Sequence, residues 1–183
     1  MSDFLEIAPD TAKNTRTINE LNELSADLQQ KAIRSSLHAA AVPLVQAMKS
    51  AAPDDPSTPW SSLSASINKV AAKTGKSVRT GAGVRTVSLG ENEVALIVGP
   101  NKKIKGRNMH GVASITEWGS KQHIIGPKAD KNMRIGKTFV AGTVMHPGVR
   151  AKHWMSGALQ DTESRFEALF YTGLEKWLNK YGR

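Results

Sequence analysis

Two tripeptides contain residue types that could hold a nucleotide phosphate: Gly75–Ser77 reads Gly-Lys-Ser, and Gly136–Thr138 reads Gly-Lys-Thr. A phosphate-binding loop also needs a glycine five residues earlier, so that its backbone amides can wrap the phosphates. Those earlier positions hold Val70 and Lys131. Gly81–Gly83 lacks the third glycine of a dinucleotide fingerprint. The spacing argues against an NTPase, and we expect no nucleotide cofactor.

Metal and acid–base chemistry are equally poorly supported. The chain has no cysteine, and no two of its histidines have the i, i+4 spacing of a helical metal site. The five histidines are His38, His110, His123, His146 and His153. Acids are sparse in the middle of the chain, and no nucleophile-elbow motif occurs. We expect no metal, no cofactor and no enzymatic activity, with a hydrolase as the weakest alternative.

Positive charge is concentrated in the middle of the chain. The formal net charge is +9, and residues 69–152 alone carry sixteen Lys and Arg against four Asp and Glu. This excess predicts a polyanionic partner, either nucleic acid or an acidic protein surface. The region lacks interleaved aromatic residues, which argues against stacking on single strands. The candidate partner-binding residues are Lys102, Lys103, Lys105, Arg107, Lys121, Lys128, Lys131, Arg134 and Lys137.

Length and composition predict one globular domain. The chain has 183 residues, of which 39% are hydrophobic and 22% charged. Its first residues do not form a secretory signal, and no apolar run is long enough to cross a bilayer. We therefore expect a soluble protein that remains where it is made and makes no membrane contact.

A long helix is predicted near the N-terminus, after an extension over residues 1–16. Thr17 and Glu20 have the spacing of a capping box, so we expect the helix to begin there. An apolar stripe continues from Ile18 to about Ala51. Pro43 removes a helical hydrogen bond and should bend this helix near Ala39 or make two helices meet there.

A second long helix is predicted at the other end, from Trp154 to about Tyr181. Apolar side chains recur there at helical spacing, and Gly182 is placed to end the last turn. We interpret the aromatic residues on this stripe as core, because a helix that packs on a sheet must bury one face.

The segment between the helices has weaker, strand-like patterns. Val84–Leu89 and Val94–Val98 flank a turn-rich tetrad and predict a β-hairpin, and Lys137–Met145 predicts a further strand. The basic stretches 69–83 and 101–108 are expected to be mobile linkers. The fold class is therefore α+β: a small antiparallel sheet packed with a long kinked N-terminal helix and a long C-terminal amphipathic helix.

Glu117, Trp118 and Gly119 should mark the end of a short helix beginning near Val112. We expect Trp118 to pack inward and Gly119 to adopt the left-handed conformation that terminates the helix. Trp154 is expected to anchor the final helix in the core.

The order of these segments resembles the tail-component, or tail completion, proteins of long-tailed bacteriophages. The resemblance spans about residues 17–178, the greater part of a predicted domain over 17–183 with long basic loops at 69–83, 101–108 and 121–137. It rests on five segments in order: Ala51–Pro53 after the first helix, Leu63–Ile67, Leu96–Pro100, Val112–Ser120 and His153–Leu159, the last preceded by His146–Val149.

The resemblance implies a structural virion protein of the phage neck, of the tail completion or tail terminator type. Identical copies would form a ring, with six-fold symmetry to match the tail tube, at the head-proximal end of the tail. The expected partners are further copies, the tail tube, neck or connector proteins and DNA in the lumen, with assembly in the host cytoplasm. The alternative is a non-specific nucleic-acid-binding protein that uses the basic middle region.

Overall fold

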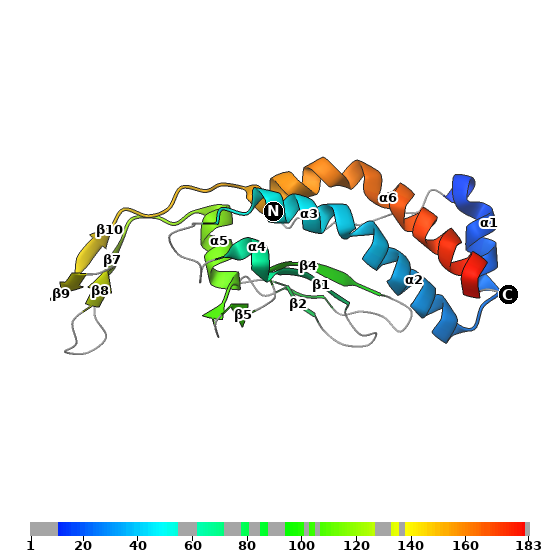
Figure 1. Cartoon of the computed structure of the whole chain (residues 1–183), viewed down its shortest axis with the longest axis horizontal. Helices are drawn as coiled ribbons and strands as arrows, with labels where there is room; N and C mark the ends of the chain where they lie inside the picture. Colours follow the sequence, from blue (N-terminus) through cyan, green and yellow to red (C-terminus); the bar gives the residue numbers. More distant parts are fainter. Residues whose placement is uncertain are drawn as a thin grey trace.

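The fold combines a helical layer with short two-stranded sheets and is α+β, as predicted (Figure 1). The computed structural model describes residues 11–54, 62–71, 78–80, 85–87, 94–100, 103–104, 107–126, 133–135 and 138–181. The helices are α1 (Thr11–Asn22), α2 (Ala26–Ala40), α3 (Val42–Ala51), α4 (Leu63–Ser66), α5 (His110–Trp118) and α6 (Trp154–Tyr181). The strands are β1 (Ile67–Ala71), β2 (Val78–Thr80), β3 (Arg85–Val87), β4 (Leu96–Pro100), β5 (Lys103–Ile104), β6 (Arg107–Asn108), β7 (His123–Ile125), β8 (Met133–Ile135), β9 (Thr138–Val140) and β10 (Val144–His146).

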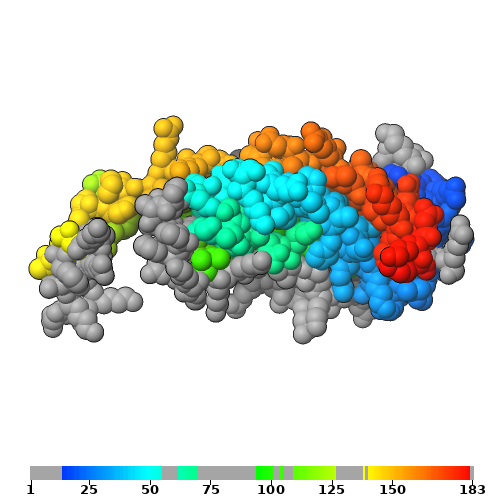
Figure 2. All heavy atoms as spheres, in the orientation of Figure 1, coloured from blue at the N-terminus to red at the C-terminus, as the bar shows by residue number. Residues whose placement is uncertain are grey.

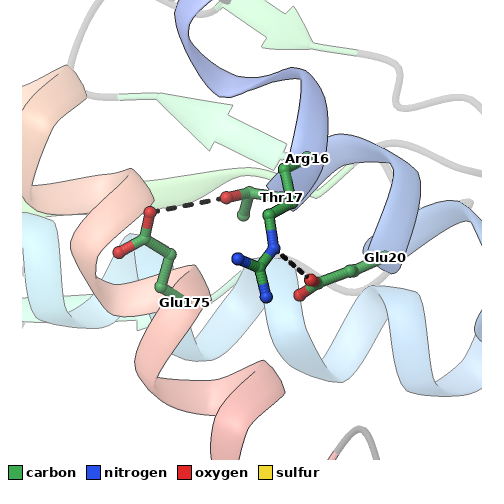
Figure 3. Close-up of polar contacts among 4 residues, drawn as sticks. All are labelled: Arg16, Thr17, Glu20 and Glu175. Carbon is green, nitrogen blue, oxygen red and sulfur yellow. Dashed lines mark hydrogen bonds and ion pairs between the residues drawn. The ribbon is translucent and has the colours of Figure 1, made fainter.

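The predicted capping box at Thr17 is wrong. Helix α1 begins at Thr11, so Thr17 lies inside it, and the Thr17 hydroxyl donates to the Glu175 carboxylate on α6 at 3.4 Å (Figure 3). Glu20 accepts from the Arg16 guanidinium at 2.8 Å, and this hydrogen bond raises the pKa of Arg16. Tertiary contact with α6 thus replaces the local cap that the spacing suggested.

The long N-terminal helix is divided into three. It breaks at residues 23–25, between α1 and α2, where the apolar stripe predicted continuity. The alternative prediction, two helices meeting near Ala39, is confirmed: they meet at Ala41, which ends α2 and precedes α3. Pro43 lies in the first turn of α3, where its missing amide would have no helical partner. Proline therefore starts a new helix here.

The predicted hairpin of Val84–Leu89 with Val94–Val98 is also wrong. β3 pairs with β2 in register Val78↔Val87, and β4 pairs with β1 in register Ile67↔Pro100, both antiparallel. The stretches expected to be linkers thus contribute β1, β2, β5 and β6. The strand predicted over Lys137–Met145 consists of β9 and β10, which are separated around Gly142, whose φ is 91°.

Helix α6 joins two hydrophobic clusters (Figure 1). At its N-terminal half, Trp154 and Ala158 pack with residues of α3, α4, β1 and α5. At its C-terminal half, Tyr171, Leu174 and Leu178 pack against α1 and α2. The prediction of a single helix with one buried face is confirmed, and the buried residues of that face include Tyr171 and Leu174.

Strands β7 to β10 extend away from the body of the molecule, at the end opposite to α1 (Figures 1 and 2). We call this feature the arm: residues 120–149, described over 120–126, 133–135 and 138–149. β10 pairs with β7 in register Met145↔Ile124, and β8 pairs with β9. Within the described residues, the extensive contacts of these four strands are with one another.

Truncating a side chain in the C-terminal cluster should destabilise the fold. Leu174 is 1% exposed, so Leu174→Ala should lower the free energy of unfolding by about 2–5 kcal/mol, measured by urea denaturation. Val42→Ala on α3, where Val42 is 40% exposed, is the control and should change it by about 0.5 kcal/mol or less. Equal losses in the two variants would contradict the assignment of α6 as the core helix.

Candidate assembly site

The arm leaves and rejoins the body at the junction between α5 and α6. Two antiparallel hydrogen bonds link Ser120 and Val149 at the base of the arm, at 2.8 and 3.1 Å. The returning chain then donates from the Lys152 and His153 amides to the Thr116 and Glu117 carbonyls, at 2.9 and 3.2 Å. Carbonyl groups at the end of a helix normally lack partners. The end of α5 therefore fixes where the chain re-enters the body.

The Glu117 side chain accepts hydrogen bonds from backbone amides at the start of α6. Its carboxylate accepts from the Met155 amide at 2.7 Å and from the Ser156 amide at 3.1 Å, and also accepts from the Ser156 hydroxyl. The side chain is 0% exposed. These amides belong to the first turn of α6, where the helix dipole stabilises a negative charge. The C-terminus of α5 and the N-terminus of α6 therefore cap each other.

Gly119 is required by this close approach. Its φ is 76°, positive as predicted, but its ψ of −179° lies outside the left-handed helical region. A Cβ at this position would lie 2.6 Å from the Val149 carbonyl oxygen and 2.8 Å from the Ala151 amide nitrogen. Both neighbours are backbone atoms, so a side chain would force the junction apart.

The two tryptophans of the junction differ in their exposure. Trp154 is buried, and its indole donates to the Thr116 hydroxyl at 3.2 Å. Trp118, which was expected to pack inward, is 54% exposed and lies edge-on to His153, with ring centroids 5.8 Å apart. The expectation for Trp118 is wrong because Glu117 occupies the inward-facing position at the end of α5.

One exposed apolar surface lies on α5, beside the junction, and a second lies on the arm. On α5, Val112, Ile115 and Trp118 follow at intervals of three along the side opposite to the buried Ala113 and Glu117; we call them the α5 stripe. On the arm, Ile124 and Met145 face each other across β7 and β10 and are 65% and 53% exposed; we call them the arm pair. These five make up most of the large hydrophobic side chains that are exposed in the described part of the chain.

The predicted basic site is only partly described. Lys121 is exposed at the base of the arm, Lys103 and Arg107 lie on β5 and β6, and Arg134 lies on β8. For Lys103, Arg107 and Arg134, the structure describes the backbone and not the side chain. The remaining candidates, Lys102, Lys105, Lys128, Lys131 and Lys137, lie outside the described residues. Their partner-binding role stays a prediction.

Two of the five histidines lie next to each other, although their spacing in the sequence did not indicate it. His146 lies across the arm from His123, with ring centroids 5.0 Å apart. Each Nδ1 atom has a backbone partner, the Lys121 carbonyl for His123 and the Gly148 amide for His146. Within the described ranges, no group of three metal-ligating side chains occurs. None of the described helices combines the length and apolarity needed to cross a bilayer.

A family model matches residues 15–119, which is more than half of the chain, and its description reads "Bacteriophage HK97-gp10, putative tail-component". The chain belongs to the HK97-gp10-like family of phage tail components. No curated protein and no solved structure gives a significant match. The matched segment runs from α1 to Gly119, so it ends at the junction, with the arm and α6 beyond it.

Sequence reasoning missed two features of this HK97-gp10-like chain. Glu117 was noted only as part of a family motif, because its partners lie 38 and 39 residues further along the chain and leave no local pattern. The arm pair was missed because Ile124 lies in a stretch treated as a basic loop. The adjacent apolar residues Ile124 and Ile125, opposite Val144 and Met145, were the available signal.

Removing the Glu117 carboxylate should destabilise the junction. Glu117→Ala leaves buried amide donors at the start of α6 without their acceptor, so the free energy of unfolding should fall by about 1–3 kcal/mol in urea denaturation. Glu117→Gln keeps one acceptor oxygen, so its free energy of unfolding should lie between those of the unchanged protein and of Glu117→Ala. Glu163→Ala, at an exposed position of α6, is the control and should have almost no effect. A loss no larger than that of the control would show that the carboxylate does not support the junction.

Proposed function

We propose that this protein is a structural virion component of the phage neck, of the tail completion or tail terminator type. Identical copies form a ring, six-fold to match the tail tube, at the head-proximal end of the tail, and the ring joins the tail to neck or connector proteins. The observation that carries this proposal is membership of a tail-component family across residues 15–119.

The shape of the subunit supports an assembly role over a catalytic one. An arm that projects from the body presents surface to other molecules; it carries the exposed arm pair, and the exposed α5 stripe ends at its attachment. Contiguous exposed apolar side chains mark interaction sites in soluble proteins. Heterologous contacts that close on themselves generate a ring, in which every subunit is equivalent.

We further propose that the basic residues contact DNA in the lumen of the ring. The +12 charge of residues 69–152 favours a polyanion, and Lys121, Arg150 and Lys152 are exposed at the base of the arm. Non-specific DNA binding outside a virion is the alternative function that this same charge supports.

Electron microscopy of the purified full-length protein with and without phage tail tubes tests the neck assignment. We expect a ring of subunits at one end of each tube, and the symmetry of that density gives the number of copies. A protein that stays monomeric and ignores the tubes would contradict the proposal and favour the nucleic-acid alternative.

The contribution of the basic residues to DNA binding is tested by salt dependence. Affinity for duplex DNA should fall steeply with salt, and the variant Lys102→Gln, Lys103→Gln, Lys105→Gln, Arg107→Gln should reduce the slope of log K against log salt by about 0.9 for each phosphate that it no longer neutralises. Fluorescence anisotropy from about 50 to 200 mM salt measures both quantities. Lys49→Gln, at an exposed position on α3, is the control and should keep the original slope. An unchanged slope in the quadruple variant would exclude this cluster from DNA contact.

A further inference from the structure

We propose that the arm of one subunit docks on the α5 stripe of a second copy of this chain, with Ile124 and Met145 packed against Val112, Ile115 and Trp118. This inference rests on the proposed ring and deepens it, because it names the contact between neighbouring subunits. The occupant of the stripe is thus a defined segment of the same chain.

The arm carries apolar side chains on both faces of a two-stranded ribbon. Residues directly opposite in an antiparallel pair share a face, so Ile124 and Met145 lie on one face and Ile125 and Val144 on the other. An isolated two-stranded ribbon is at best marginally stable in water. A further surface against which to pack would therefore stabilise the arm, and the described residues of its own body make no extensive contact with it (Figure 1).

The α5 stripe is an apolar surface of matching character. Val112, Ile115 and Trp118 are 38%, 46% and 54% exposed, although the opposite side of α5 is fully committed to the core and to the α6 cap. Trp118 is the type of residue that is enriched at the centres of protein interfaces. Because the backbone of α5 is fixed at the junction, the stripe is presented on a rigid element.

A second copy accounts for both surfaces at once. In the described part of the chain, β7 and β10 extend away from α5 (Figure 1), so a second copy offers the α5 stripe on which the arm docks. In a closed ring each copy donates one arm and offers one stripe, and both apolar surfaces of every copy are covered. Docking of the arm on the stripe thus covers both surfaces with one kind of contact.

The absence of natural cysteine makes this contact directly measurable. We would mix two full-length variants, Ile124→Cys and Ile115→Cys, with and without tail tubes, and add a short bismaleimide cross-linker. The expected product is a covalent pair between the two variants, at least about fivefold in excess of either self-pair, identified by mass spectrometry. Val42→Cys mixed with Ile124→Cys is the control, since Val42 is exposed on α3 outside both surfaces.

Substitution gives a second readout. Ile124→Ser combined with Met145→Ser should weaken self-association by about tenfold or more while leaving the melting temperature unchanged, because both side chains are exposed in the subunit. Analytical ultracentrifugation measures the association, and the apolar contact should persist at high salt, unlike one made by the basic residues.

The outcomes separate this inference from the neck function. Rings on tail tubes that give no Ile124–Ile115 pair above the control would overturn the docking and leave the neck function standing. The same pair in a closed two-copy particle that ignores tubes would support the docking and overturn the neck function. Protein that neither associates nor binds tubes would overturn both.

Discussion

The buried carboxylate of Glu117 joins the end of α5 to the start of α6. Moving an ionised carboxylate out of water costs several kcal/mol unless its oxygens are hydrogen-bonded. Here the two oxygens accept hydrogen bonds from two amides and a hydroxyl in the first turn of α6. This turn is the positive end of the longest helix in the described part of the chain. Beside it, Ser120 and Val149 pair at the base of the arm and the Trp154 indole donates to the Thr116 hydroxyl, which brings the same two helix ends together.

This junction explains how one fold carries a large projection. The arm begins and ends at a point where α5 and α6 are already locked to each other, so its strands can extend without disturbing the two hydrophobic clusters. The family match also stops at this point, at Gly119. Elements of the matched segment form one side of both hydrophobic clusters, and α6 completes the clusters from the other side.

The parts of the fold that the sequence predicted are those with a strong local signal. The period of apolar residues from Trp154 to Tyr181 predicted α6, and Pro43 predicted the bend between α2 and α3. The parts that it did not predict depend on partners distant in the chain. β4 pairs with β1 in place of the nearer β3, and the Thr17 hydroxyl bonds to Glu175 on α6 rather than capping its own helix.

The candidate site shows the same contrast between local signals and distant partners. This contrast explains why Trp118 was wrongly predicted to pack inward. A tryptophan at the end of an amphipathic helix normally packs inward, but α5 presents its adjacent glutamate to the core, because only the carboxylate can cap α6. Placing Glu117 inward turns Trp118 outward, beside Ile115 and Val112. The interaction that joins α5 to α6 therefore also leaves an apolar stripe exposed on α5, so one constraint on Glu117 sets both the helix junction and the exposed stripe.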